Sequence, residues 1–226
     1  MRRYLLAVTL GCMIGLLSPF SQQAEAISVL DFEGLQSLEE VGNFYNGGLG
    51  GSGSGPGPNF GVIFSDNSIT LQESHPLANF TNPPSAETTV FFLTGTADTM
   101  NVPAGFDTGF SFFYSSTTFN GSVTVWDGLN GTGNILATLN LAALGSCGPP
   151  DPFCNWEPVG VNFSGVARSV DFSGVANQIG FDNITLESAT PGGAAIPEPA
   201  TIALLGLALL SLAVGAHITR GSHRIF

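Results

Sequence analysis

Apolar and polar residues alternate along most of the chain between residues 27 and 187. Short runs rich in Val, Ile, Phe and Thr recur between clusters of Gly, Asn, Pro and Ser, whereas helical periodicity is almost absent. Short strands with regularly spaced turns predict an all-β, antiparallel β-sandwich, with a jelly-roll-like arrangement favoured. The strands are expected near residues 28–33, 60–64, 88–94, 108–114, 122–126, 134–140, 157–163, 168–173 and 177–186.

The alternation also assigns side chains to the two faces of several strands. Phe110, Phe112 and Tyr114 share one face of their strand, as Val123 and Val125 do in the next strand. The chain has 18 Phe residues, and most of them lie in the predicted strands. These aromatic side chains are therefore expected to supply the apolar core.

The last predicted strand changes its parity halfway along. Ile179 and Phe181 point to one face, whereas Ile184 and Leu186 have the opposite parity. A one-residue bulge at residues 182–183 would bring all four side chains to the core.

Residues 1–26 have the three parts of a secretory signal peptide. Two Arg residues precede an apolar run over 4–17, and an Ala-x-Ala site follows at 24–26. Cleavage is therefore expected before Ile27. The alternative, a lipoprotein anchored at Cys12, is disfavoured because the apolar run continues past this residue.

A second apolar run lies near the C-terminus, after a predicted linker at 188–195. Residues 200–218 would span about 28 Å as a helix, which is close to the hydrocarbon thickness of a bilayer. Arg220 and Arg224 follow and are expected to stay on the cytoplasmic side. We predict one transmembrane helix rather than a buried core helix, because the run has no polar stripe.

Pro197, Glu198 and Pro199 stand directly before this apolar run. The motif, the span and the basic tail together make residues 196–226 resemble the PEP-CTERM sorting signal of exported bacterial proteins. The two prolines exclude helix and hold Glu198 in an extended segment. The resemblance implies recognition and processing by an exosortase, with the three residues as the recognition element.

The charge of the chain is unevenly distributed. Of its 17 Asp and Glu residues, fifteen lie between residues 27 and 196, where Arg168 is the only Lys or Arg. A field of one negative sign repels nucleic acid and anionic lipid, so we expect no nucleic-acid partner. The acids keep a Gly-rich exported domain soluble and could also attract divalent cations.

Three acidic residues in the first and last predicted strands form a candidate metal site. The segments 31–33 and 178–186 resemble the opening and closing strands of jelly-roll carbohydrate-binding and lectin-like modules. The resemblance implies a structural Ca²⁺ held by such strands. Oxygen ligands from Asp31, Glu33 and Asp182 suit Ca²⁺, whereas the alternative is three solvated acids. We expect no other cofactor.

Cys147 and Cys154 are the two cysteines that remain after signal-peptide removal. An even pair in an oxidising compartment predicts a disulfide. A metal site or a redox pair is disfavoured, because no His lies near and the spacing is not C-x-x-C.

Exposed aromatic rings beside polar side chains are typical of sugar-binding sites. Trp126 is expected to face away from the core next to Asp127, and Trp156 lies beside the disulfide loop. These three residues are the candidate ligand-binding residues. The alternative is that both indoles cover a sheet edge or pack under a loop.

No catalytic signature stands out in the predicted domain, 27–187. It lacks a G-x-S-x-G motif, and its one His, His75, is expected in a surface loop. The Gly-rich segment 47–58 has no G-K-[ST] sequence and is expected to be a flexible loop.

The sequence thus predicts a non-catalytic, structural or carbohydrate-binding protein of the cell envelope. It is expected to be membrane-anchored before processing, then at the cell surface or in the extracellular matrix. Extracellular polysaccharide is the expected ligand. A secreted polysaccharide-acting enzyme of jelly-roll fold is the alternative.

Overall fold

The computed structural model describes residues 27–192. This part of the chain is all-β, and it contains no helix long and apolar enough to cross a membrane. The predicted signal peptide, the motif Pro197-Glu198-Pro199 and the predicted span 200–218 lie outside the described residues.

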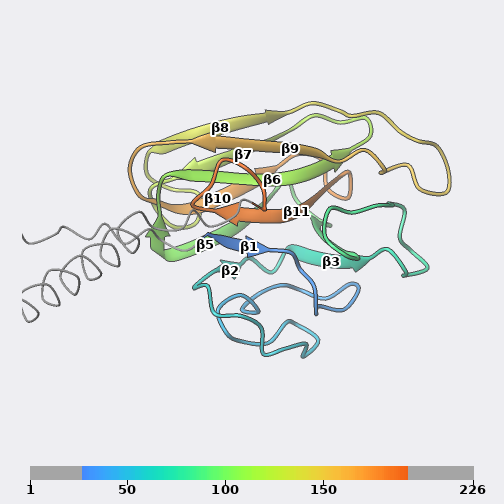
Figure 1. The fold of residues 1–226 in the computed structure, drawn as a ribbon, viewed down its shortest axis with the longest axis horizontal. Helices are drawn as coiled ribbons and strands as arrows, with labels where there is room; N and C mark the ends of the chain where they lie inside the picture. Colours follow the sequence, from blue (N-terminus) through green and yellow to red (C-terminus); the bar gives the residue numbers. More distant parts are fainter. Residues whose placement is uncertain (1–26, 193–226) are drawn as a thin grey trace, which may run out of the picture. The chain divides into compact units, whose positions relative to one another are not determined.

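Eleven strands form two antiparallel sheets, whose strands overlap in the view of Figure 1. The six-stranded sheet contains β1 (Ser28–Leu30), β3 (Ser68–Gln72), β4 (Thr88–Phe92), β6 (Gly109–Ser116), β9 (Glu157–Asn162) and β11 (Ile179–Leu186). The five-stranded sheet contains β2 (Ile63–Phe64), β5 (Ala97–Phe106), β7 (Gly121–Trp126), β8 (Ile135–Leu141) and β10 (Ala167–Ser173).

The order of the strands confirms the predicted antiparallel sandwich. One sheet runs β3-β4-β11-β6-β9, with β1 also paired to β11, and the other runs β2-β5-β10-β7-β8. Strands β4 to β11 therefore form two four-stranded layers, β4-β11-β6-β9 and β5-β10-β7-β8, with most connections crossing between them. This order agrees with the double-sheet pattern of a jelly roll.

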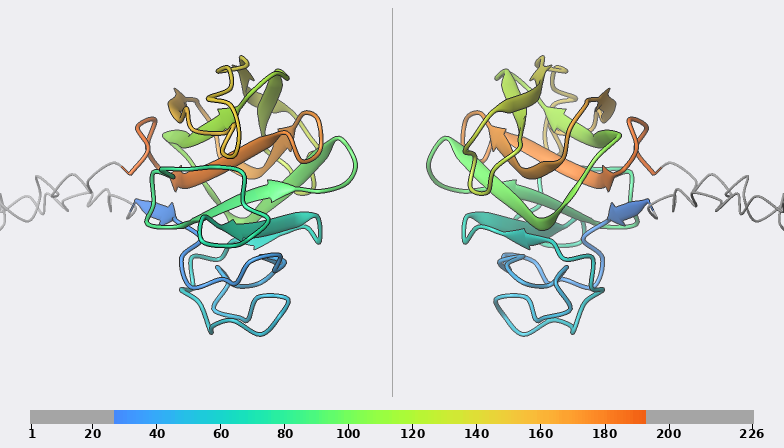
Figure 2. Two further views of the ribbon diagram at one scale, coloured as in Figure 1. Left: turned by 90° about the vertical axis from the view of Figure 1, so that its right-hand side faces the viewer. Right: turned by 90° about the vertical axis from the view of Figure 1, so that its left-hand side faces the viewer.

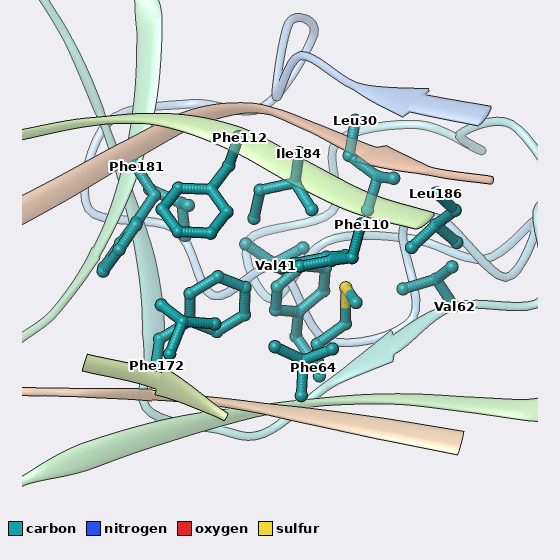
Figure 3. Close-up of a cluster of buried hydrophobic side chains, with 14 of the residues drawn as sticks. Leu30, Val41, Val62, Phe64, Phe110, Phe112, Phe172, Phe181, Ile184 and Leu186 are labelled. Carbon is teal, nitrogen blue, oxygen red and sulfur yellow. The ribbon is translucent and has the colours of Figure 1, made fainter. Parts of the chain in front are cut away.

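Aromatic rings from both sheets fill the space between them (Figure 3). Phe172 of β10 lies 6.0 Å from Phe112 of β6 and 4.9 Å from Phe181 of β11, measured between ring centroids. Phe110 lies 5.6 Å from Phe112 along β6. The predicted core-facing residues of β6 and β7 are all buried.

The bulge predicted in β11 is present. Asp182 pairs with Phe113 and Thr185 with Ser111, so β11 contains one more residue than β6 over this interval. Asn183 takes up the extra length with a φ of 47°. As expected, Ile179, Phe181, Ile184 and Leu186 are all buried.

All nine predicted strands correspond to observed ones, with ends that differ by a few residues. Strands β3 and β5 were not predicted. The inward positions of β3 are Ser68 and Thr70, which are polar, and β5 contains Pro103 and Gly105, which disfavour strands. The register between β5 and β10 shifts in the part of β5 that holds these two residues.

The segment between β1 and β2 forms a lobe beside the sheets, coloured blue to cyan in Figure 2. The Gly-rich segment 47–58, predicted to be a flexible loop, lies in this lobe as a loop that is tied to a buried carboxylate. Its backbone donates hydrogen bonds from Ser52 and Ser54 to Oε1 of Glu39, at 2.8 and 3.0 Å. Glu39 is buried and accepts a further bond from Gln36 N at Oε2.

Candidate functional site

A hollow lies on the outer face of the six-stranded sheet. Its floor is formed by side chains that point away from the core, on β3, β4, β11 and β6. Phe91, Gly180 and Ser115 lie in register across three of these strands. Because Gly180 has no side chain and Ser115 has a small one, the floor is low at this point. The other floor residues are Leu71 and Thr89, with Ile179 beside them.

Two loop segments form the walls of the hollow. Residues 79–81 pair with Phe153 through hydrogen bonds from Phe153 N to Asn79 O and from Thr81 N to Phe153 O. Trp156 donates from Nε1 to the carbonyl of Thr81 at 3.1 Å. Phe80 packs edge-on against Trp156, with ring centroids 6.3 Å apart. The indole is therefore fixed by a hydrogen bond and by an aromatic contact.

The predicted disulfide is present and belongs to one of these walls. Cys147 and Cys154 are bonded, and Cys154 directly follows Phe153. Within the closed loop, Cys147 N donates to Pro152 O. The disulfide thus restricts the segment that carries Phe153 and leads to Trp156. A disulfide of this kind is typical of an exported protein.

Four polar side chains line the hollow without a hydrogen-bond partner anywhere in residues 27–192. Asn79 and Asn177 are exposed at its rim, whereas Thr89 and Ser115 are 3 % and 2 % exposed. In residues 27–192, the one side-chain N or O atom that is both sealed from solvent and without a hydrogen-bond partner is Nε1 of Trp126, in the other sheet. The hydroxyl oxygens of Thr89 and Ser115 also lack a partner, so they are not sealed from solvent and are reachable from the hollow.

The hollow is electrically neutral. None of its lining residues is ionisable at neutral pH, and the lining combines aromatic rings with amides and hydroxyls. Arg168, the one Lys or Arg between residues 27 and 192, bonds to Pro103 O in the five-stranded sheet. The arrangement suits an uncharged ligand that has both apolar and hydrogen-bonding faces.

The structure separates the three candidate ligand-binding residues. Trp156 lines the hollow, whereas Trp126 and Asp127 belong to the end of β7 in the five-stranded sheet. Trp126 is half-buried, and its Nε1 is sealed from solvent without a hydrogen-bond partner. Asp127 holds a turn by accepting bonds from the backbone and side chain of Asn134, at 2.7 and 2.8 Å. These bonds lower the pKa of the Asp127 carboxyl.

Sequence reasoning missed most of the hollow. Phe80 and the polar residues around it gave no local signal, because they come from segments far apart in the sequence. Only Trp156 was marked, by its position beside the cysteines. Pairing of three strands around Gly180 brings the remaining floor residues together.

The acidic residues predicted to bind Ca²⁺ lie in a hydrogen-bonded network. Ser85 bridges two of them: its N–H donates to Asp182 Oδ2 at 2.7 Å and its hydroxyl to Glu33 Oε1 at 3.0 Å. Glu33 Oε1 also accepts from the backbone of Glu87 and Thr88, both at 2.8 Å. Asp182 is completely buried, so its interpretation as a solvated acid is wrong.

Asp31 lies nearby but is exposed, and its Oδ1 accepts from Glu33 N and from the hydroxyl of Tyr45. Burial raises the pKa of Asp182 to about 7, and the charge of Glu33 adds to this although hydrogen bonds from Ser85 oppose it. Residues 27–192 contain no group of three or more His, Cys, Asp or Glu positioned to hold a metal ion. Calcium therefore stays a prediction, and its binding would require these hydrogen bonds to rearrange.

Comparisons with known proteins give similarity at the level of solved structures only. No family model matches the chain, and no curated protein matches it significantly. The K2 cleaved adhesin domain of Lys-gingipain is 11% identical, with 71% of this chain and 99% of that chain covered and a TM-score of 0.47. A family 6 carbohydrate-binding module is 18% identical, with 56% and 92% covered and a TM-score of 0.37. A family 11 carbohydrate-binding module from Clostridium thermocellum is 14% identical, with 57% and 88% covered and a TM-score of 0.29. Similarity this low carries no conclusion about a ligand.

Proposed function

We propose that this protein is a non-catalytic carbohydrate-binding domain that binds neutral polysaccharide through the hollow beside Trp156. The supporting observation is the combination of fixed aromatic walls with four unpartnered polar side chains. A ring face packs on the apolar face of a pyranose, while amides and hydroxyls bond to its hydroxyl groups. The lining contains no carboxylate or imidazole that could serve as a general acid or base, which favours binding over catalysis.

We further propose that the protein acts at the cell surface or in the extracellular matrix after export. The predicted signal peptide, the Cys147–Cys154 disulfide and the resemblance of residues 196–226 to a PEP-CTERM signal support this location. In this proposal, an exosortase recognises Pro197, Glu198 and Pro199, and residues 200–218 anchor the chain until it is processed.

Trp156→Ala is expected to weaken polysaccharide binding by about tenfold or more, because the variant loses the largest aromatic side chain that lines the hollow. Residues 27–192 enclose a core of their own and are suited to this test. Affinity electrophoresis against neutral polysaccharides, including that of the native host, measures the effect. Trp126→Ala, on the other sheet, is expected to leave binding unchanged. An effect of Trp126→Ala alone would place the site elsewhere, and no binding to any polysaccharide would refute the proposal.

The intact mass of the mature protein from its native host tests the sorting proposal. Processing predicts an N-terminus at Ile27 and a C-terminus near Pro197–Pro199, with residues 200–218 absent. A Glu198→Ala variant is expected to accumulate with the C-terminal segment retained. A wild-type mass that includes Phe226 would show that the protein is not processed.

A further inference from the structure

We propose that the hollow selects N-acetylated amino sugars, with the acetamido group of the sugar inserted over Gly180. This inference rests on the proposed carbohydrate-binding function and specifies the ligand class of the same site. Three features of the hollow support it: its size, the chemistry of its lining and the absence of a side chain at Gly180.

The size of the hollow fits a substituent better than a whole sugar ring. Its cavity volume is about 40 Å³, and it is partly open to solvent. A cavity needs roughly 10–15 Å³ to hold one water, so the hollow has room for a few non-hydrogen atoms. The acetyl part of an acetamido group has three non-hydrogen atoms. A pyranose ring with its substituents is too large to enter and would lie at the open side of the hollow, against Trp156.

The lining matches both halves of an acetamido group. The apolar side chains of Leu71, Phe91 and Trp156 provide contacts for a methyl group. The hydroxyls of Thr89 and Ser115 are nearly buried, have no partner within residues 27–192, and can donate to a carbonyl or accept from an amide N–H. An acetamido group offers a methyl, a carbonyl and an N–H within a few bonds.

Other sugar substituents fit less well. The hydroxymethyl group of a neutral hexose has no methyl for the apolar part of the cavity. The carboxylate of a uronic acid would need a cation, and none of the lining residues is basic. The excess of acidic residues across the domain also repels anionic polymers. The charge and shape of the site thus favour a neutral sugar with a small amide substituent.

Gly180 creates the cavity without being required by the backbone. Its φ lies outside the left-handed region, and a Cβ at this position would lie 3.6 Å from Trp156 Cη2, at ordinary van der Waals distance. A β-branched side chain is therefore compatible with the strand and would occupy the cavity. Gly180 is, on this view, a specificity-determining residue.

Titration calorimetry with chitotetraose and cellotetraose tests the inference. Both are β-1,4-linked tetrasaccharides, and they differ only at C2 of each sugar unit, where chitotetraose has an acetamido group and cellotetraose has a hydroxyl. Residues 27–192 are expected to bind chitotetraose at least about tenfold more tightly. Gly180→Val should remove this preference while the melting temperature stays near that of the wild type. Thr89→Val should weaken chitotetraose binding selectively. Thr124→Val, the same exchange on the outer face of the other sheet, should not.

Chitotetraose binding no tighter than cellotetraose binding would overturn the inference. A preference for chitotetraose that persists in a folded Gly180→Val variant would overturn it as well. Neither result depends on the polysaccharide assay with Trp156→Ala. If that assay shows binding while the two tetrasaccharides bind alike, only the acetamido specificity fails. If no carbohydrate binds in either assay, the proposed function fails too.

Discussion

Glu39→Ala is expected to lower the free energy of unfolding by about 3 kcal/mol or more. The variant removes the acceptor for three backbone N–H groups, those of Gln36, Ser52 and Ser54. The bond from Ser54 is buried and those from Gln36 and Ser52 are part-buried, and a buried donor left without a partner costs about 1–3 kcal/mol. The Gly-rich segment has little apolar surface of its own, so the loss of these bonds should open the lobe. Urea denaturation of residues 27–192 measures the change.

Two further variants make the Glu39 prediction specific. Glu40→Ala alters the neighbouring exposed acid and is expected to change stability by less than about 0.5 kcal/mol. Glu39→Gln keeps one acceptor oxygen for Ser52 and Ser54 but not for Gln36, and should fall between the two. Equal stability of Glu39→Ala and Glu40→Ala would contradict the assigned role.

The pH dependence of the lobe follows from the same contacts. Burial alone raises the pKa of Glu39, but the hydrogen bonds from Ser54, Gln36 and Ser52 outweigh it and hold the pKa below 4.5. The carboxylate therefore contributes stability above its ordinary pKa. This contribution is lost as the pH falls through the lowered value.

The period-two pattern predicted the strands whose inward side chains are apolar. Strand β6 is an example, because Phe110, Phe112 and Tyr114 are all inward and buried. Strand β5 shows this pattern only at Met100 and Val102, because the inward residue before them is Asp98, which is buried and accepts bonds from the hydroxyls of Ser65 and Ser68. Tertiary hydrogen bonds that involve distant residues replace apolar contacts here, and such bonds leave no periodic signal in the sequence.

Local composition was misleading where a distant residue determines the structure. The glycines of 47–58 predict flexibility, yet one carboxylate, that of Glu39, organises the segment. The hollow shows the same limit, because its low floor depends on Gly180 lying between Phe91 and Ser115 in neighbouring strands. Composition shows which residues are small, but only strand pairing shows that they are adjacent.

The bulge in β11 was predictable, but its consequence for Asp182 was not. The parity change between Phe181 and Ile184 identifies the extra residue. Burial of Asp182 depends on the segment that contains Ser85, which lies over the carboxylate and donates a backbone hydrogen bond to it. This segment is almost a hundred residues away in the sequence. Parity alone places Asp182 on the outer face of the sheet and does not show that this face is covered there.

Without divalent cations, the stability of residues 27–192 is expected to fall as the pH rises from about 4 to about 7. Burial raises the pKa of Asp182 from 3.8 to about 7, with a further contribution from Glu33. In this pH range the folded state holds a proton that the unfolded state has released, so stability decreases with pH. The shift corresponds to a loss on the order of 4 kcal/mol. Asp98 acts in the same direction, because burial raises its pKa as well.

Asp182→Asn separates these contributions and also tests the calcium prediction. The variant is expected to flatten the pH dependence between 4 and 7, whereas Asp66→Asn, at an exposed turn, should keep the wild-type slope. An unchanged slope in Asp182→Asn would contradict the assignment. Calcium binding requires the ionised carboxylate, so Ca²⁺ should raise the melting temperature of the wild type at pH 8 but not at pH 5. If saturating Ca²⁺ causes no shift at pH 8, the acids around Ser85 form a hydrogen-bonded network that binds no calcium.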